Sequence, residues 1–189
     1  MTGDSLLRIV VILFPLSEAA LSVLRRARGG IARHADQGSI RVLWLVILGS
    51  VTLAVIASML GMPPLPASRR AQTALALSLM LSGMAVRWIA IVSLGRFFTV
   101  DVAIHDQHAL VDSGLYRYVR HPSYTGLLLA FAGLGVYFGN WLSLALATVP
   151  VTAALLSRIG KEEAALLEGL GAEYAAYCAR TPRLVPGLY

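Results

Sequence analysis

Charged side chains are scarce in this chain: Asp, Glu, Lys and Arg together make up 14% of its 189 residues, whereas 57% of the residues are hydrophobic. Soluble globular domains carry about 25% charged residues, because their surfaces face water. A chain with so little charge is not expected to cover a soluble surface. The composition therefore predicts a protein that crosses a membrane several times.

Cysteine is also nearly absent, since Cys178 is the single one. One thiol excludes an intramolecular disulfide and a metal cluster held by thiolates, and no metal site is expected. The sequence has no internal repeat and no low-complexity tract. We therefore expect one integral-membrane domain over residues 1–189, with two N-terminal spans in residues 1–70 and the core in residues 71–189.

Long apolar runs predict where the chain crosses the membrane. Three such runs occupy residues 6–24, 42–60 and 71–94. Each is close to the ~20 residues that cross a ~30 Å hydrocarbon layer as a helix. A fourth run, residues 122–157, would form a helix of about 54 Å at ~1.5 Å per residue, which is too long for one crossing. We expect it to turn at Gly139-Asn140 into a helical hairpin, which gives an all-α fold with about five transmembrane helices.

The basic residues predict the orientation of these spans. With five crossings, twelve of the sixteen basic residues fall on one side of the membrane, against only Arg69 and Arg70 in the opposite loop. The twelve are Arg25, Arg26, Arg28, Arg33, Arg41, Arg96, Arg117, Arg120, Arg158, Lys161, Arg180 and Arg183. The positive-inside rule makes this side cytoplasmic, with the N-terminus outside and the C-terminus inside. Because topology explains the net charge of +6, no nucleic-acid partner is expected.

Two polar segments lie on the predicted cytoplasmic side. The first, residues 95–124, is about 30 residues long, and a connection of that length is usually functional. The second is the tail, where apolar residues recur at steps of three, four or seven: Ile159, Leu166, Leu167, Leu170, Tyr174 and Tyr177. This spacing predicts a cytoplasmic amphipathic helix that ends at Thr181-Pro182.

Motifs in these two segments resemble one known family. The motif residues are His108-Ala109-Leu110-Val111-Asp112-Ser113-Gly114-Leu115-Tyr116, Arg120-His121-Pro122-Ser123-Tyr124, Gly126, Arg158, Glu162-Glu163, Leu170-Gly171, Glu173-Tyr174, Tyr177, Pro182 and Pro186. In this order and spacing they resemble the isoprenylcysteine carboxyl methyltransferase family and its phospholipid-methyltransferase relatives, over roughly residues 83–189.

The resemblance implies an S-adenosylmethionine site without a Rossmann sheet, built from the loop before the hairpin and the tail. The residues that would enclose the cofactor are His108, Ala109, Leu110, Val111, Tyr116, His121, Pro122, Ser123, Tyr124 and Glu162. Asp101, which aligns with a glutamine of the animal enzymes, is a further expected cofactor contact. Arg158, together with Arg87, is expected to bind substrate. Residues 71–189 would then be the catalytic core.

The chemistry of methyl transfer agrees with these residue types. S-adenosylmethionine carries a sulfonium, an ammonium, a carboxylate and an adenine, so its site needs an anion, hydrogen-bond donors and an aromatic or apolar slot. Transfer requires in-line alignment in a site shielded from water. A carboxylate acceptor is already ionised at neutral pH, so Arg158 would only have to hold it. An amine or phenol acceptor would need a base, for which His121 or Glu163 is expected.

Structural interpretations of the same residues stay open at this point. His121-Pro122 is also a pattern that begins a helix, with proline in the first turn. Arg158 and Glu162, four residues apart, are also spaced as a solvated ion pair. Arg87 lies inside an apolar run, where a charge costs about 2.5–3.5 kcal/mol on insertion scales. We expect it either to snorkel toward the headgroups or to pair with a tail carboxylate such as Glu163.

Two other functions also stay open. A membrane sterol reductase, which uses NADPH, shares a similar helical core and a related segment, but its asparagine and its acid are replaced here by Ser123 and Leu127. A non-catalytic membrane scaffold is the second alternative. The expected methyl acceptor is a lipophilic molecule from the bilayer, most simply an isoprenylcysteine-like carboxylate. The sequence does not predict the oligomeric state. The compact chain suits a prokaryotic plasma (inner) membrane protein.

Overall fold

The computed structural model describes residues 3–24, 38–95 and 110–187, and within these ranges the regular structure is helical. The helices are α1 (Gly3–Leu24), α2 (Ser39–Met59), α3 (Arg69–Leu94), the 3₁₀ helix η3 (Gly114–Arg117), α4 (Pro122–Phe138), α5 (Trp141–Leu170) and α6 (Ala172–Arg180). The predicted all-α class is confirmed, and a long helix lies at each of the five predicted spans.

The hairpin turns where the sequence predicts. Gly139 ends α4 with a φ of 79°, a left-handed conformation that glycine adopts without a steric penalty. Asn140 then caps α5, because its side-chain oxygen accepts a hydrogen bond of 2.8 Å from the Ser143 N–H. A left-handed glycine followed by a capping asparagine reverses the chain within two residues.

Three of the described helices, α2, α3 and α5, are long and apolar enough to cross a bilayer. Helix α4 is apolar but only 17 residues long, and α1 carries the charged residues Asp4, Arg8 and Glu18. Helix α5 has 30 residues, about 45 Å at ~1.5 Å per residue, so it extends beyond a ~30 Å hydrocarbon layer. Its last turns project toward α6.

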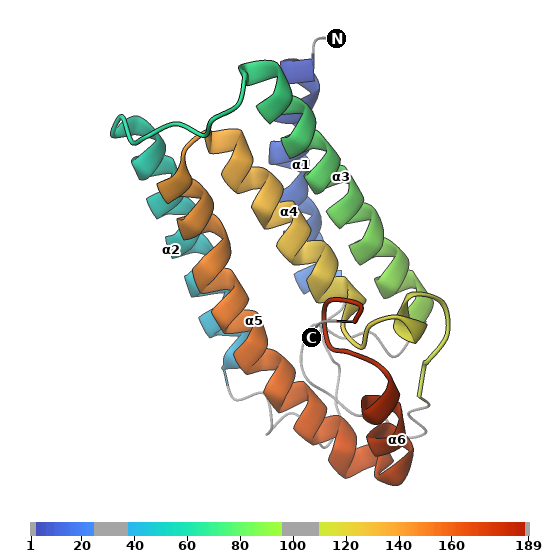
Figure 1. Ribbon diagram of the computed structural model, residues 1–189. Coiled ribbons are helices and arrows are strands. Elements are labelled where there is room, and N and C mark those ends of the chain that lie inside the picture. Colours follow the sequence, from blue (N-terminus) through green and yellow to red (C-terminus); the bar gives the residue numbers. More distant parts are fainter. Residues whose placement is uncertain (1–2, 25–37, 96–109, 188–189) are drawn as a thin grey trace.

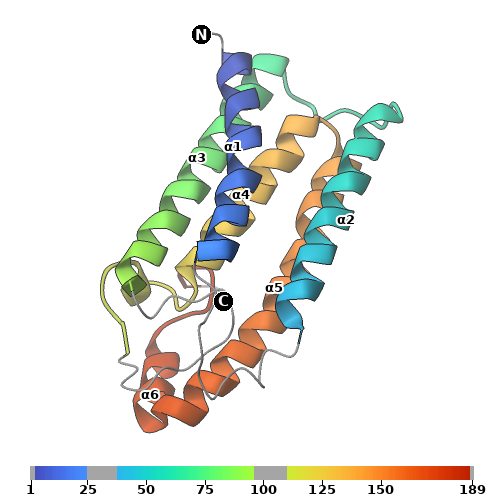
Figure 2. The ribbon, with the colours of Figure 1, turned by 180° about the vertical axis from the view of Figure 1, so that it is seen from behind.

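The five long helices form a bundle in which successive helices alternate in direction (Figures 1 and 2). Helix α3 lies along α4, α2 lies along α5, and α1 lies against α3 on the side of the bundle that faces the viewer in Figure 2. Helix α6 turns back from the end of α5, and the tail after it returns to the start of α4 (Figure 1). The start of α4 and the end of α5 therefore meet at one end of the bundle, opposite the N-terminus.

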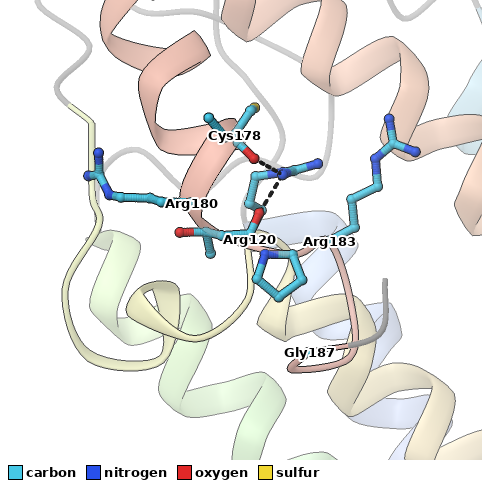
Figure 3. Close-up of a pocket in the computed structure, with 8 residues that line it drawn as sticks. Arg120, Cys178, Arg180, Arg183 and Gly187 are labelled. Carbon is cyan, nitrogen blue, oxygen red and sulfur yellow. Dashed lines mark hydrogen bonds between the residues drawn. The ribbon is translucent and has the colours of Figure 1, made fainter.

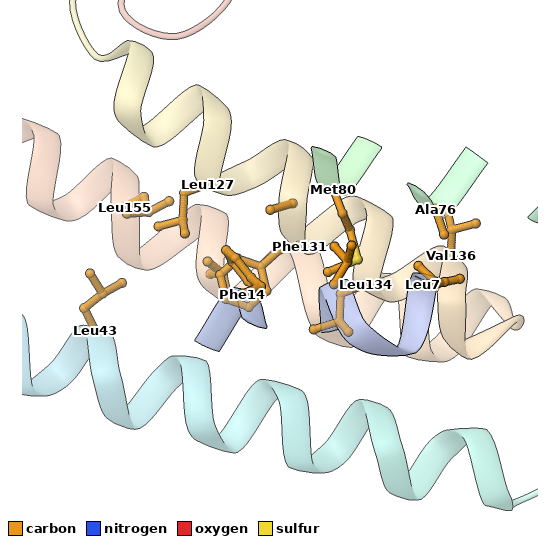
Figure 4. Packing of buried hydrophobic residues seen from close by; sticks show 13 residues of the cluster. Leu7, Phe14, Leu43, Ala76, Met80, Leu127, Phe131, Leu134, Val136 and Leu155 are labelled. Atoms are coloured by element: carbon orange, nitrogen blue, oxygen red, sulfur yellow. The ribbon is translucent and has the colours of Figure 1, made fainter. Parts of the chain in front are cut away.

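Apolar side chains from all five long helices meet in the core (Figure 4). Phe14 of α1 packs edge-on against Phe131 of α4, with ring centroids 5.4 Å apart. Helices α3 and α4 approach most closely at glycines: a Cβ on Gly83 would lie 2.5 Å from the carbonyl oxygen of Gly126. Small residues allow such close backbone contact between helices in a membrane, and here the contact brings the first turns of α4 against α3.

Arg87 has a partner that the sequence analysis did not anticipate. Its Nε and Nη2 each donate a hydrogen bond of 2.5 Å to the carboxylate of Glu18 on α1, and its Nη1 donates one of 3.2 Å to the Ser123 carbonyl. Pairing with Glu163 was therefore wrong, and so was snorkelling, since the arginine is 8% exposed. A buried guanidinium requires a counter-ion, and α1 supplies it at the depth of Arg87.

Candidate active site

The predicted site residues that the structure describes gather at the end of the bundle where α4 begins and α5 ends. Three segments contribute: residues 110–121, the first turn of α4, and the end of α5. The residues described there are Leu110, Val111, Tyr116, His121, Pro122, Ser123, Tyr124, Arg158, Glu162 and Glu163. Arg87, the other predicted substrate residue, lies on α3 and reaches this end through its hydrogen bond to the Ser123 carbonyl. The predicted residues Asp101, His108 and Ala109 lie outside the described ranges.

A continuous hydrogen-bonded chain links α5 to the start of α4. The Tyr124 hydroxyl donates to Glu162 Oε2 at 2.8 Å and accepts from Arg158 Nε at 3.0 Å. Arg158 is 4% exposed, and its Nη1 also donates to the Ser39 hydroxyl at 2.7 Å. The structure thus brings a carboxylate and a guanidinium to one phenol hydroxyl. Tyr124 therefore bridges Arg158 and Glu162. A simple ion pair between these two residues at a solvated surface would need no such bridge.

His121 stands at the N-cap position of α4, with Pro122 in the first turn as expected, but its side chain makes no capping hydrogen bond. Its ring stacks on Tyr124 with centroids 5.6 Å apart and an interplanar angle of 11°. Its Nε2 lies 3.2 Å from Glu163 Oε1, and its Nδ1 lies 3.9 Å from Glu162 Oε2. The imidazole is therefore held between two carboxylates and one aromatic ring.

Glu163 is the centre of an ion-pair cluster. Its Oε1 accepts a hydrogen bond of 2.9 Å from Arg120 Nε, and its Oε2 lies 2.8 Å from Arg183 Nη2. With His121 Nε2 also at 3.2 Å, both carboxylate oxygens face cationic or hydrogen-bonding partners. The Glu163 side chain is 11% exposed. This geometry suits a structural role for Glu163, in which it holds three segments together. It suits less well the role of a base, which would have to reach a substrate.

The tail is fastened to the start of α4 through the backbone as well. The Arg120 N–H donates to the Pro182 carbonyl at 2.8 Å, and the His121 N–H donates to the Arg183 carbonyl at 3.0 Å. One turn into α4, the Thr125 hydroxyl donates to the Leu184 carbonyl at 2.7 Å. These contacts hold the chain end across the residues that lead into α4.

Arg120 holds the tail in place, a structural role that the sequence analysis did not give it. Its guanidinium donates to Glu163. It also donates to the carbonyls of Cys178 and Thr181 (Figure 3). A groove of about 450 Å³ surrounds it, lined by Arg120, Cys178, Ala179, Arg180, Thr181, Pro182, Arg183 and Gly187. Arg180 and Arg183 point away from each other in this groove (Figure 3). Arg120 and Arg183 both bind Glu163, whereas Arg180 pairs with Asp112 at 2.6 Å, so the arginines here hold the tail in place.

Tyrosines connect η3 with α6. Tyr116 is buried, and its hydroxyl donates to the Ala90 carbonyl at 3.3 Å. The Tyr177 hydroxyl donates to the Tyr116 carbonyl at 2.6 Å. Burial raises the pKa of the Tyr116 hydroxyl, and it raises the pKa of Tyr177 to about 12, so both hydroxyls keep their protons near neutral pH. Helix α6 is thereby docked against the segment that carries Tyr116.

A family profile matches the part of the chain that carries this site. Residues 75–168 match the isoprenylcysteine carboxyl methyltransferase (ICMT) family. Over residues 3–24, 38–95 and 110–187 there is no group of three or more His, Cys, Asp or Glu side chains able to hold a metal ion.

Curated relatives come from the same family. A probable protein-S-isoprenylcysteine O-methyltransferase of Oryza sativa subsp. indica is 36% identical over 112 residues, which are 58% of this chain and 59% of that protein. The protein-S-isoprenylcysteine O-methyltransferase of Schizosaccharomyces pombe is 34% identical over 113 residues, or 59% of this chain and 48% of that protein. The chain thus matches about three fifths or less of the length of these relatives.

A solved structure shows the same fold. It is the eukaryotic intramembrane Ras methyltransferase ICMT, with a TM-score of 0.60, 24% sequence identity, and coverage of 77% of this chain and 52% of that chain. Together with the three apolar helices long enough to cross a bilayer, this likeness shows an integral membrane protein.

Proposed function

Because its residues 75–168 belong to the isoprenylcysteine carboxyl methyltransferase family, we propose that this chain is a methyltransferase. It moves a methyl group from S-adenosylmethionine to a lipophilic acceptor. The acceptor is most simply an isoprenylcysteine-like carboxylate. The observation that supports this most directly is the Arg158–Tyr124–Glu162 chain, in which a cation and an anion are hydrogen-bonded to the same phenol hydroxyl. A carboxylate and a guanidinium in one site can bind a cationic donor and an anionic acceptor next to each other.

The described residues fit S-adenosylmethionine as a ligand. Glu162 offers a carboxylate whose side chain is 31% exposed, so it is open to a cationic group. His121 and Tyr124 present stacked rings beside it, and Tyr116 lies on the neighbouring segment. When bound, the cofactor supplies an electrophilic methyl group on a sulfonium sulfur. The residues of the chain then have to orient that group and exclude water from it.

Arg158 is the residue suited to hold the acceptor. Its Nε and Nη1 hydrogen bonds fix the guanidinium to Tyr124 and Ser39, so it loses little freedom when an anion binds. It is 4% exposed, and an ion pair formed away from bulk water is stronger than one at a hydrated surface. A carboxylate acceptor arrives ionised, so no proton transfer is required. His121 remains the candidate base if the acceptor is an amine or a phenol.

The proposed orientation puts the site on the cytoplasmic face. Among the described residues, Arg41, Arg117, Arg120, Lys161 and Arg180 lie toward this end of the bundle, and Arg69 and Arg70 begin α3 at the other. The positive-inside rule then places the N-terminus outside and the C-terminus in the cytoplasm. A prokaryotic plasma membrane stays a prediction, since the relatives described above are eukaryotic.

Titration calorimetry on the purified full chain in nanodiscs tests the proposal. S-adenosylmethionine should bind and NADPH should not, because the site carries an acidic group suited to a sulfonium. If only NADPH binds, the sterol-reductase alternative replaces the proposal. If neither ligand binds, the alternative of a non-catalytic membrane scaffold replaces it. Incubation of the loaded nanodiscs with a prenylated cysteine and labelled donor then tests the acceptor, for which we expect label as a base-labile methyl ester.

A further inference from the structure

Tyr174 of α6 has a hydroxyl that the fold leaves without a partner. The residue is 3% exposed, and its Oη is the one buried side-chain nitrogen or oxygen of the described residues that has no hydrogen-bond partner. A buried polar group without a partner destabilises the folded state, because it loses its hydrogen bonds to water. Such groups are rare in folded proteins, and each one calls for an explanation.

The position of Tyr174 places this hydroxyl beside the proposed donor site. One turn further along α6, Tyr177 lies with its ring centroid 6.0 Å from that of Tyr174, and its hydroxyl is bonded to the Tyr116 carbonyl at 2.6 Å. On the other side, α6 follows the end of α5 after Gly171 and contacts that helix, which carries Glu162 and Glu163. Tyr174 therefore lies between η3 and the end of α5, two segments that would enclose the donor.

Neighbouring groups of the protein are already engaged. Glu163 accepts from Arg120 and Arg183 and faces His121, while Glu162 Oε2 accepts from Tyr124. Burial also raises the pKa of the Tyr174 hydroxyl, so it remains a protonated donor near neutral pH. A phenylalanine would fill the same space without the cost of an unpaired hydroxyl. The presence of a buried hydroxyl at this position is explained if a bound ligand supplies its hydrogen-bond acceptor.

We propose that the Tyr174 hydroxyl donates a hydrogen bond to the bound methyl donor, so that α6 forms a third side of the donor site. This inference rests on the proposed function and extends it to a residue that the motif comparison did not assign to the cofactor. The acceptor would be an oxygen or a ring nitrogen of the nucleoside or amino-acid part, since the sulfonium accepts no hydrogen bond. The contact would form only in the loaded protein.

The test compares three tyrosine-to-phenylalanine variants of the full chain in nanodiscs, each lacking one hydroxyl. Tyr174→Phe removes the unpaired hydroxyl, Tyr177→Phe removes one that is bonded within the fold, and Tyr137→Phe removes one at the opposite end of the bundle. We measure the melting temperature without ligand and the Kd for S-adenosylmethionine by calorimetry. Tyr174→Phe should raise the Kd about 3- to 10-fold and leave the melting temperature equal or higher.

The controls separate the possible outcomes. Tyr137→Phe should bind the donor as the parent does, and Tyr177→Phe should lower the melting temperature of the unliganded protein. Unchanged donor affinity in Tyr174→Phe would overturn the inference while leaving the proposed function intact. A lower melting temperature in that variant would overturn it too, because the hydroxyl would then have a partner within the fold. If the parent itself binds no donor, the proposed function and this inference fail together.

Discussion

The buried pair of Arg87 and Glu18 makes a quantitative prediction about stability. The side chains are 10% and 12% exposed, and the two hydrogen bonds between them are bidentate. We consider Glu18→Leu and Arg87→Met alone and combined, because these apolar residues approximate the volumes that they replace. Each single change leaves one charge buried without a partner, whereas the double change removes both charges.

The expected magnitudes follow from the surroundings of the pair. Breaking a buried ion pair costs about 3–5 kcal/mol in soluble proteins, and an unpaired charge inside a bilayer costs about 2.5–3.5 kcal/mol on insertion scales. The ranges overlap near 3 kcal/mol, which is the destabilisation expected for each single variant. The double variant should lose only about 1 kcal/mol, because the Ser123 carbonyl still loses its hydrogen bond from Arg87 Nη1. The coupling energy is then about 5 kcal/mol.

Reversible unfolding in mixed micelles, followed by circular dichroism, measures these free energies. Destabilisations of the single variants that add up to that of the double variant, within about 0.5 kcal/mol, would refute the reasoning. The same variants decide the predicted substrate role of Arg87. If Arg87 only positions the start of α4, the folded double variant keeps the acceptor KM of the parent. A raised acceptor KM at unchanged donor affinity would instead support the predicted role of Arg87 in substrate binding.

Three further predictions concern the site and the helix contact that supports it. Glu162→Ala should weaken donor binding about tenfold, because a cation in the site loses its counter-charge, while Glu168→Ala on an exposed part of the same helix should not; calorimetry with the donor decides. Arg158→Ala should raise the acceptor KM more than the donor Kd, and equal effects in steady-state and binding assays would count against a role in acceptor binding. Gly83→Ala should lower the unfolding free energy by at least about 1–3 kcal/mol, because the new Cβ would lie 2.5 Å from a backbone oxygen of α4, and a melting temperature equal to the parent's would contradict this contact.

Local sequence signals predicted the features of the fold that depend on neighbours along the chain. Run length predicted the helices, and Gly139-Asn140 predicted the hairpin, because a left-handed glycine and a capping asparagine act within a few residues. The meeting of Tyr124 with Arg158 and Glu162 followed from motif resemblance and not from periodicity, since the contacts span more than thirty residues of chain.

Contacts that depend on how separate helices face one another could not be predicted in this way. Glu18 interrupts the first apolar run, and that is a signal for a buried partner, but the sequence does not say how α1 is rotated toward Arg87. Arg120 stands inside the recognised motif, yet its role depends on the tail crossing the start of α4. Tertiary arrangement decides such contacts, and a periodic pattern describes only one element at a time.

The length of α5 explains why the proposed site can reach both water and lipid. Trp141, 56% exposed, begins the helix and suits the outer interface, where tryptophan is enriched. Counting from it at ~1.5 Å per residue, Arg158 lies about 26 Å further along and Glu162 about 32 Å, on either side of the ~30 Å thickness of the hydrocarbon layer. An acceptor held by Arg158 would therefore keep its apolar chain among the lipids. A donor held by Glu162 would enter from the water, and Tyr124 lies between the two positions.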